Sequence, residues 1–335
     1  MLMVLPCQSA NVLRKSSAIQ EKEPMANRFP SLQDTLRMAR LSKLVYSFKN
    51  HDDADDDYCA TGFSSEDGFR CLWHQHYTDL GTRVLLVSHP QERYLVVVFA
   101  GTEDVRTVLE DAHLAMKPFG NNGTVAMPDP GIKVHAGFDN AVFSHGIFDE
   151  IWSKIKAFKR THPFYQLWTT GHSLGAANSI LTATALALKG YAVTCINFGC
   201  PQSGNNAWRN YFNTTSPLKD KLGIWRVVLG CDIVARLPNF FEHVGHTIQI
   251  WSEDRQRFDK RDPNLVEAYY EHYGDAQEGY ASIPSGWSSK PYFWVPGAFS
   301  HHFMTRYIEF LEQIEELDLW VDGVSHRNLP IEVVF

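Results

Sequence analysis

The stretch that decides the fold is FYQLWTTGHSLGAANSILTATALALK, residues 164–189. Its first eight residues have the pattern of a buried strand, and the part from Leu174 onward has that of a small-residue helix ending at Gly190. The segment GHSLG, Gly171–Gly175, joins the two without a loop. A strand that runs into a helix across Gly-x-Ser-x-Gly is typical of a nucleophile elbow in an open α/β sheet. We therefore predict Ser173 as a nucleophile rather than part of a purely structural glycine-rich turn.

The two glycines of this segment have a physical reason to be there. A side chain two residues before or after Ser173 would collide with the neighbouring strand or helix, so Gly171 and Gly175 suit an elbow. The helix that begins at Leu174 also directs backbone N–H groups toward the serine, which favours an anionic intermediate.

A serine nucleophile needs two partners. Its hydroxyl is weakly nucleophilic, so a histidine must accept its proton and an acid must orient that histidine. In this class of sheet the acid follows the serine and the histidine follows the acid. Asp232, in LGCDIVARLP, comes directly after a predicted strand and is the candidate acid, with a simple turn-forming aspartate as the alternative. Six histidines lie beyond Asp232: His243, His246, His272, His301, His302 and His326. Two of them, His301 and His302, stand at the start of the last predicted helix and are the candidates for the base.

Strand patterns occur on both sides of the elbow. Before it, FRCLWHQHYT, TRVLLVSH and RYLVVVFAGT, residues 69–78, 82–89 and 93–102, predict a meander. After it, YAVTCINFG, IWRVVLGCD and HTIQIW, residues 191–199, 224–232 and 246–251, predict further strands.

Helical spacing alternates with these strands. A helix is predicted from Ser31, a single long helix over residues 138–161, and a last helix in HHFMTRYIEFLEQIEEL, residues 301–317. We expect the apolar face of the last helix to hold Phe303, Tyr307, Phe310, Leu311 and Ile314. The alternation after residue 90 predicts an α/β fold with a mostly parallel central sheet and helices on both faces.

The chain is expected to form one domain. With 335 residues, 44% of them hydrophobic, it can bury one large core. Residues 1–28 are polar and unpatterned and are interpreted as a flexible tail, which leaves 29–335 as the single domain.

Composition excludes several classes of protein. The net charge is -7 and no block of Lys or Arg is present, which argues against a nucleic-acid partner. No apolar run approaches the roughly 18 residues of a spanning helix, so no transmembrane segment is expected. The Cys-x-x-Cys spacing of a zinc site is absent. The acidic run HDDADDDY, residues 51–58, lacks the glycine and the distal glutamate of a calcium loop and is interpreted as a solvated loop. The sequence indicates neither a metal nor a cofactor.

The N-terminal segment and the cysteines bear on the cellular location. The apolar start of the chain has no preceding basic residue and stops at Pro6, so it makes a poor secretory signal, while Arg14 and Lys15 leave organelle targeting open. Six cysteines are too few for a disulfide scaffold, and Cys59 with Cys71 is the one pair worth testing. A cytoplasmic location is favoured.

Several motifs together resemble one family, the class 3 lipases. They are VVVFAGTED, VHAGF, TTGHSLGAANSILTA, NFGCPQSGN, GCDIVARLP and FEHVGHTIQIW, which follow the family order from about residue 94 to 251. The resemblance implies an α/β-hydrolase fold, Ser173 as nucleophile and Asp232 as the acid of the triad. It also implies Thr102, through its backbone N–H and hydroxyl, and the backbone N–H of Leu174 as the oxyanion hole.

The sequence departs from the family pattern at two points. Ala100 stands where the family usually has an arginine before the oxyanion Gly-Thr, so a supporting ion pair is not expected. The family usually has an aromatic residue three positions after the catalytic histidine, but Met304 follows His301 and Thr305 follows His302 at that spacing. Tyr307, five positions beyond His302, is similar to some plant members, so His302 is favoured with His301 as the alternative. Four other histidines are expected to serve the scaffold: His135, His172, His243 and His246.

The resemblance also implies a lid at about residues 103–131. It would contain a short helix over EDVRTVLEDAHL, residues 103–114, that could open at a lipid surface. The alternative is that this helix is an ordinary surface helix. The favoured function is hydrolysis of fatty-acyl esters of glycerolipids, in particular triacylglycerol, through an acyl-enzyme. Phospholipase A1, a small-ester or feruloyl esterase, a non-catalytic lipid- or protein-binding member, and a peptidase or acyltransferase are the alternatives.

Overall fold

The computed structural model describes residues 28–47, 59, 63–65, 67–102, 115–120, 125, 127–212, 216–230, 232–238, 241–250, 268–269 and 299–316. The predicted tail, the acidic run 51–58 and the lid helix expected over 103–114 lie outside these residues.

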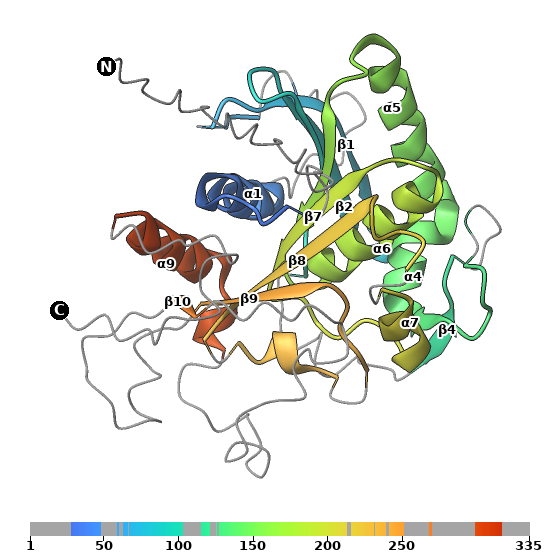
Figure 1. Cartoon of the computed structure of the whole chain (residues 1–335). Helices are drawn as coiled ribbons and strands as arrows, with labels where there is room; N and C mark the ends of the chain where they lie inside the picture. Colours follow the sequence, from blue (N-terminus) through green and yellow to red (C-terminus); the bar gives the residue numbers. More distant parts are fainter. Residues whose placement is uncertain are drawn as a thin grey trace, which may run out of the picture.

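An eight-stranded sheet forms the centre of the molecule (Figure 1). Its strands, in spatial order, are β1 Arg70–Tyr77, β2 Thr82–His89, β3 Tyr94–Phe99, β6 Gln166–Gly171, β7 Val193–Phe198, β8 Leu222–Leu229, β9 His246–Ile250 and β10 Ala268–Tyr269. The pairings β1 to β2, β2 to β3 and β9 to β10 are antiparallel, and those from β3 through β6, β7, β8 to β9 are parallel. The predicted meander and the mostly parallel sheet are confirmed.

Helices cover both faces of this sheet (Figure 1). On one face lie α1 Leu32–Leu44 and α9 Met304–Glu316, and on the other α4 Ala136–Phe143, α5 Ile147–Thr161 and α6 Leu174–Leu188. The strands β3, β7 and β8 are buried along their whole length, as expected when both faces of a sheet are covered. Helix α6 is buried from Gly175 to Ala187 because its small side chains let it approach the sheet closely.

Shorter elements complete the described chain. They are the strands β4 Met116–Pro118 and β5 Lys133–His135, the helix α7 Asn206–Tyr211, and the 3-10 turns η2 Val45–Ser47, η3 Thr78–Leu80, η4 Ser144–Gly146, η5 Val234–Arg236 and η7 Ser300–His302. Helix α1 begins as predicted, since the Ser31 hydroxyl accepts the Asp34 N–H at 3.0 Å.

Two expectations about helices are wrong. The single helix expected over residues 138–161 is two helices, because the turn η4 between them holds His145 at φ 54° and Gly146 at φ 73°. Phe303 precedes α9 and is 55% exposed, so it does not belong to the buried face that Tyr307, Phe310, Leu311 and Ile314 form.

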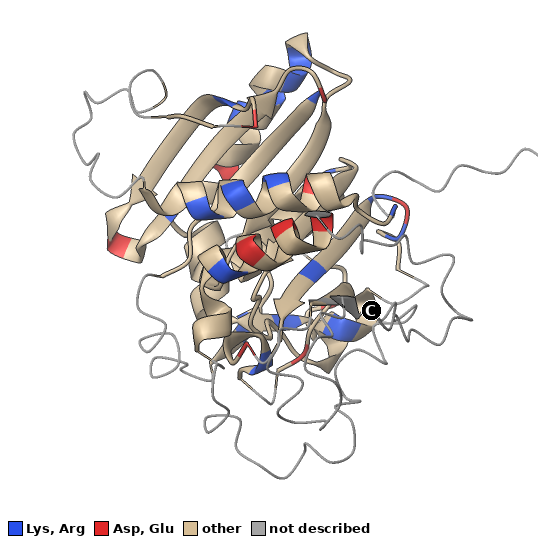
Figure 2. Ribbon diagram, turned by 90° about the vertical axis from the view of Figure 1, so that its left-hand side faces the viewer, with Lys and Arg blue, Asp and Glu red and all other residues tan. Residues whose placement is uncertain are grey.

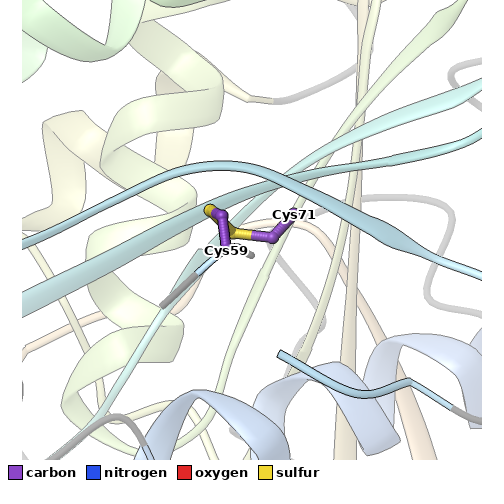
Figure 3. Close-up of a disulfide and its surroundings, with 2 residues drawn as sticks. All are labelled: Cys59 and Cys71. Carbon is purple, nitrogen blue, oxygen red and sulfur yellow. A yellow bond between two sulfur atoms is a disulfide. The ribbon is translucent and has the colours of Figure 1, made fainter. Parts of the chain in front are cut away.

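The cysteine pair singled out in the sequence forms a disulfide. Cys59 and Cys71, on β1, are joined by a disulfide (Figure 3). Cys195 and Cys200 are buried thiols, and Cys231 lies outside the described residues.

The two helices of the first face differ in their balance of charge (Figure 2). Three of the four charged residues of α1 are basic, and four of the five charged residues of α9 are Glu. Arg40 joins the helices by an ion pair to Glu312 at 3.0 Å. In the described part of the chain, no helix has the length and apolar character to cross a bilayer.

Candidate active site

Ser173 lies at the turn between β6 and α6 in a strained conformation, with φ 59° and ψ -128°. Positive φ is uncommon for a residue with a side chain, and strain of this kind is typical of a nucleophile elbow. The Ser173 N–H donates to the Phe198 carbonyl at 3.0 Å, which ties the elbow to the end of β7. The elbow is therefore fixed by the sheet itself.

The glycines at the elbow are required by contact, as the sequence predicted. A Cβ at Gly171 would meet the backbone of Gly175 and Phe99, and a Cβ at Gly175 would meet the backbone of Phe99 and Ala100. Helix α6 begins at Leu174, and the first N–H groups of a helix have no partner further along the same helix. The partial positive charge of that helix end faces the turn that carries Ser173.

Asp232 and His302 form a buried pair. His302 Nδ1 lies 2.9 Å from Asp232 Oδ1 and 3.0 Å from Oδ2, and both side chains are fully buried. The Tyr307 hydroxyl donates to Asp232 Oδ2 at 2.6 Å, and the Val234 N–H donates to Oδ1 at 2.9 Å. Burial raises the pKa of Asp232, but the charge of His302 and the hydrogen bonds from His302 and Tyr307 outweigh it, so that the pKa lies below its usual value.

These contacts separate the two histidine candidates. The structure brings His302 to Asp232, while His301 is buried beside it in the same turn, η7. A carboxylate only accepts, so His302 Nδ1 carries the proton and Nε2 is left with a lone pair. In the described part of the chain, His302 Nε2 and Ser173 Oγ are both buried and both lack a hydrogen-bond partner.

Gly199, at the end of β7, makes room for the pair. Its φ is +56°, and a Cβ there would lie 2.6 Å from Asp232 Oδ2 and 3.0 Å from His302 Nδ1. Both the backbone conformation and the space require glycine.

Thr102 follows β3, the strand beside the elbow. Its hydroxyl oxygen is buried and has no hydrogen-bond partner among the described residues. The preceding Gly101 packs against the elbow so closely that a Cβ there would collide with the carbonyl of His172 and come within 2.9 Å of Ser173 Cβ. Ala100, in place of the family arginine, is buried.

One contact residue of the site, Tyr46, was not predicted from the sequence. The Tyr46 hydroxyl, from η2, lies 2.8 Å from His172 Nδ1 and accepts the Gly101 N–H at 3.1 Å. His172 Nε2 lies 2.6 Å from the backbone carbonyl of His302. His172 therefore bonds to the site's backbone, in line with the prediction that it is part of the scaffold and not a base.

The other scaffold histidines are found away from Ser173. His135 caps α4 by accepting the Gly137 N–H at 3.2 Å, His243 Nε2 lies 2.8 Å from the Ala235 carbonyl, and His246 stacks on Trp225 with ring centres 4.6 Å apart. Burial lowers the pKa of His243 well below its usual value, and the charge of Arg226 lowers it further.

The described end of the predicted lid segment is held to the body of the protein. Asp139, fully buried on α4, accepts the Gly120 N–H at 2.7 Å and pairs with Lys117 of β4 at 2.6 Å. Burial raises the pKa of Asp139 in spite of these two partners. The segment after β3 is thus tied to α4 at Lys117 and Gly120.

Residues 96–242 match the family model described as lipase (class 3). A secreted mono- and diacylglycerol lipase of Malassezia restricta is 29% identical over 206 residues, which are 59% of this chain and 65% of the relative. A secreted mono- and diacylglycerol lipase of Malassezia globosa is 31% identical over 170 residues, 50% of this chain and 54% of the relative. The chain therefore spans less than two thirds of the length of either relative.

Solved structures share the fold. The lipase of Rhizopus microsporus var. chinensis has a TM-score of 0.55 at 18% identity, covering 76% of this chain and 88% of that one. The triacylglyceride lipase of Rhizomucor miehei has a TM-score of 0.53 at 21% identity, covering 67% and 82%. These similarities confirm the α/β-hydrolase fold. No group of side chains suited to hold a metal ion occurs in the described part of the chain.

Proposed function

We propose that this chain is a member of the class 3 lipase family and hydrolyses fatty-acyl esters of glycerolipids through an acyl-enzyme on Ser173. The observation that carries the proposal is the buried Asp232–His302 pair beside a strained serine whose hydroxyl, like His302 Nε2, is left without a partner among the described residues. Unpaired buried polar groups are costly, and they are retained where a reaction uses them.

In the proposed reaction His302 Nε2 accepts the Ser173 proton as Oγ attacks the ester carbonyl. Asp232 holds the imidazole in the required tautomer and stabilises the imidazolium that forms. The backbone N–H groups of Thr102 and Leu174, with the Thr102 hydroxyl, hold the oxyanion. Protonated His302 then releases the alcohol, and a water molecule frees the fatty acid by the same steps in reverse order.

The substrate class rests on the family and on the relatives. The two Malassezia relatives are named as mono- and diacylglycerol lipases, so partial acylglycerols are tested beside triacylglycerol. We propose that the segment at about residues 103–131 acts as a lid over the acyl groove and makes a transient contact with the lipid surface. The contact of Gly120 with Asp139 gives such a lid one anchored point within the segment.

The experiment compares wild type with Ser173→Ala on p-nitrophenyl esters of increasing chain length, and then on emulsified tri-, di- and monoacylglycerols. Ser179→Ala is the matched control, since Ser179 is a buried serine of α6, the helix that follows Ser173. Its hydroxyl contacts scaffold atoms, the Ala176 carbonyl at 2.7 Å and Cys195 Sγ at 3.5 Å. We expect Ser173→Ala to lose activity and Ser179→Ala to keep it. The chain-length optimum separates a lipase from a small-ester esterase, and phosphatidylcholine tests phospholipase A1.

If wild type and Ser173→Ala are equally inert on all of these substrates, with and without detergent, the proposed hydrolase is wrong. The chain would then be a non-catalytic member that binds a lipid or a protein partner.

The predicted cytoplasmic location stays a proposal. The Cys59–Cys71 disulfide is a bond that persists mainly in oxidising compartments, so it weighs against the cytoplasm. Alkylation of Cys59 and Cys71 before and after reduction, in cell extract and in culture medium, decides between the cytoplasm and an oxidising compartment. Cysteines that are alkylated only after reduction would indicate the oxidising compartment.

A further inference from the structure

A continuous chain of hydrogen bonds passes beside Ser173. It leads from the Gly101 N–H to the Tyr46 hydroxyl at 3.1 Å, on to His172 Nδ1 at 2.8 Å, and from His172 Nε2 to the His302 carbonyl at 2.6 Å. The four residues come from four separate parts of the fold: the end of β3, η2, the elbow and η7.

The direction of every bond in this chain follows from its last member. The His302 carbonyl can only accept, so His172 Nε2 carries the proton. A neutral imidazole then presents a lone pair at Nδ1, which means that the Tyr46 hydroxyl donates to it and accepts from Gly101. Each donor meets an acceptor in one arrangement only.

The arrangement needs a neutral His172, and its surroundings keep it neutral. Its side chain is buried, and burial, with a further contribution from the charge of His302, lowers the pKa of His172 to about 3. The rings of His172 and His302 are 4.5 Å apart. Because His172 is neutral, it does not repel the positive charge that forms on His302 during the reaction.

We propose that Tyr46 and His172 are positioning residues that hold the backbones of Gly101 and His302 on the two sides of Ser173. Gly101 precedes Thr102, so its bond to Tyr46 fixes the peptide that leads to the oxyanion donor, and the bond from His172 fixes the backbone of the base. The inference rests on the proposed function, because it assigns a role within that site. Small displacements of such groups are costly in rate, since reacting atoms must meet at near-contact distance.

The first test is Tyr46→Phe, which removes one oxygen atom. We expect kcat to fall by about 10- to 100-fold, because a misplaced group slows chemistry by this order. We expect KM to change by no more than about twofold, because the ring stays in place and ground-state binding is untouched. Tyr94→Phe is the matched control, because Tyr94 is likewise a buried tyrosine whose hydroxyl donates within the scaffold, to Asp34 at 3.0 Å. Tyr94 is the first residue of β3, at the end of that strand away from Gly101. Tyr94→Phe should change stability and leave kcat unchanged.

A second test uses His172→Gln, whose amide N–H can still reach the His302 carbonyl but which loses the imidazole nitrogen that accepts from Tyr46. If the two residues act through one chain, the kcat of the double variant with Tyr46→Phe stays within about threefold of the lower single variant. Fully multiplicative losses would mean two independent effects and would overturn the shared chain.

A third readout needs no substrate. The proton that His302 Nδ1 shares with Asp232 gives a low-field NMR resonance, assigned by its loss in His302→Gln. We expect Tyr46→Phe to shift or broaden it and Tyr94→Phe to leave it in place. If wild type hydrolyses no ester, the proposed function fails and this resonance alone decides the inference. An unchanged resonance in Tyr46→Phe, or unchanged kcat in an active enzyme, would overturn it.

Discussion

At the scale of single residues, the Asp232–His302 pair depends on the absence of a side chain at Gly199. A Cβ at this position would press on Asp232 Oδ2 and His302 Nδ1, at 2.6 and 3.0 Å. We expect Gly199→Ala to lower kcat by about 100-fold, because a displacement near 1 Å in such a pair costs this much.

Gly81→Ala is the control for this prediction. Gly81 has nearly the same φ, +61° against +56°, but a Cβ there would meet no atom within 4 Å. Both variants lose about 1 to 2 kcal/mol for a left-handed residue with a side chain, and Gly199→Ala should lose more because its Cβ also clashes, so kcat is compared at a temperature where both variants are folded. Equal kcat values for the two variants would contradict the role given to Gly199.

His172 makes stability depend on pH. Its pKa lies near 3 in the folded protein, because of burial, and near 6.5 in the unfolded chain, so the unfolded chain binds more protons between these values. Stability from this residue is therefore complete above pH 6.5 and is lost as pH falls toward 3. The loss by pH 5 is about 2 kcal/mol, at about 1.4 kcal/mol per pH unit.

Urea unfolding at pH 7 and pH 5 checks this prediction. His172→Gln removes the titrating group, so its free energy of unfolding should fall by about 2 kcal/mol less over this interval than that of wild type. Identical pH dependence in both proteins would show that His172 is not held neutral by its surroundings.

The residues of the site differ in how far the sequence could predict them. The position of Ser173 at an elbow was predictable because strand, turn and helix are adjacent in the chain, and the space required of Gly171 and Gly175 is local. The spacing of Tyr307 favoured His302 over His301, but the contact of His302 with Asp232 depends on the direction of the turn η7, which the spacing does not give. Tyr46 lies 126 positions before His172, so only the folded sheet brings them together.

At the scale of elements, the disulfide ties Cys59 to the edge strand β1. The bridge closes a loop with a sequence separation of 12 residues. Loops of this size restrict the unfolded chain by an amount worth about 3 kcal/mol. We expect Cys59→Ser/Cys71→Ser to lose about this much stability in urea, with kcat unchanged because β1 is the far edge of the sheet from His302.

A reducing agent provides the control. It should destabilise wild type by the same amount and leave the double serine variant unaffected, since Cys195 and Cys200 are buried and already reduced. A wild type that is insensitive to reduction would contradict the bridge.

The break between α4 and α5 shows why element boundaries were harder to predict than elements. Phe138, Val142, Ile147 and Ile151 all enter the same core, so the apolar periodicity runs on across the break. The signal was Gly146, which adopts the left-handed conformation that ends a helix. By contrast, the strands were predictable because a sheet covered on both faces demands continuous apolar runs.

At the scale of the whole molecule, two helices that are far apart in the sequence pack side by side on one face of the sheet (Figure 1). Arg40 of α1 reaches both Glu312 of α9 at 3.0 Å and Asp67 at 2.9 Å. The turn after α1 carries Tyr46, and the turn before α9 carries His302. The first face therefore delivers two groups to the site, although the sequence motifs of the family lie between the two helices.

This arrangement predicts different results for two truncations at the N-terminal end. Removing residues 2–27 should leave stability and kcat near wild type, in keeping with the predicted tail. Removing residues 2–47 also deletes α1 and η2, whose Leu36, Met38, Leu41 and Val45 are at most 2% exposed. Truncating one buried leucine or methionine to alanine already costs about 2 to 5 kcal/mol, and a whole domain is stable by only about 5 to 15.

The longer truncation should therefore abolish cooperative unfolding, measured by circular dichroism in urea, and not merely slow the reaction. Leu41→Ala separates the two contributions of α1, because it weakens the packing while Tyr46 keeps its hydroxyl. It should lose about 2 to 5 kcal/mol of stability and retain kcat at temperatures where it is folded. A 2–47 deletion that unfolds cooperatively at the wild-type midpoint would mean that α1 is an accessory to the fold, and the delivery of Tyr46 to the site would then be its main contribution.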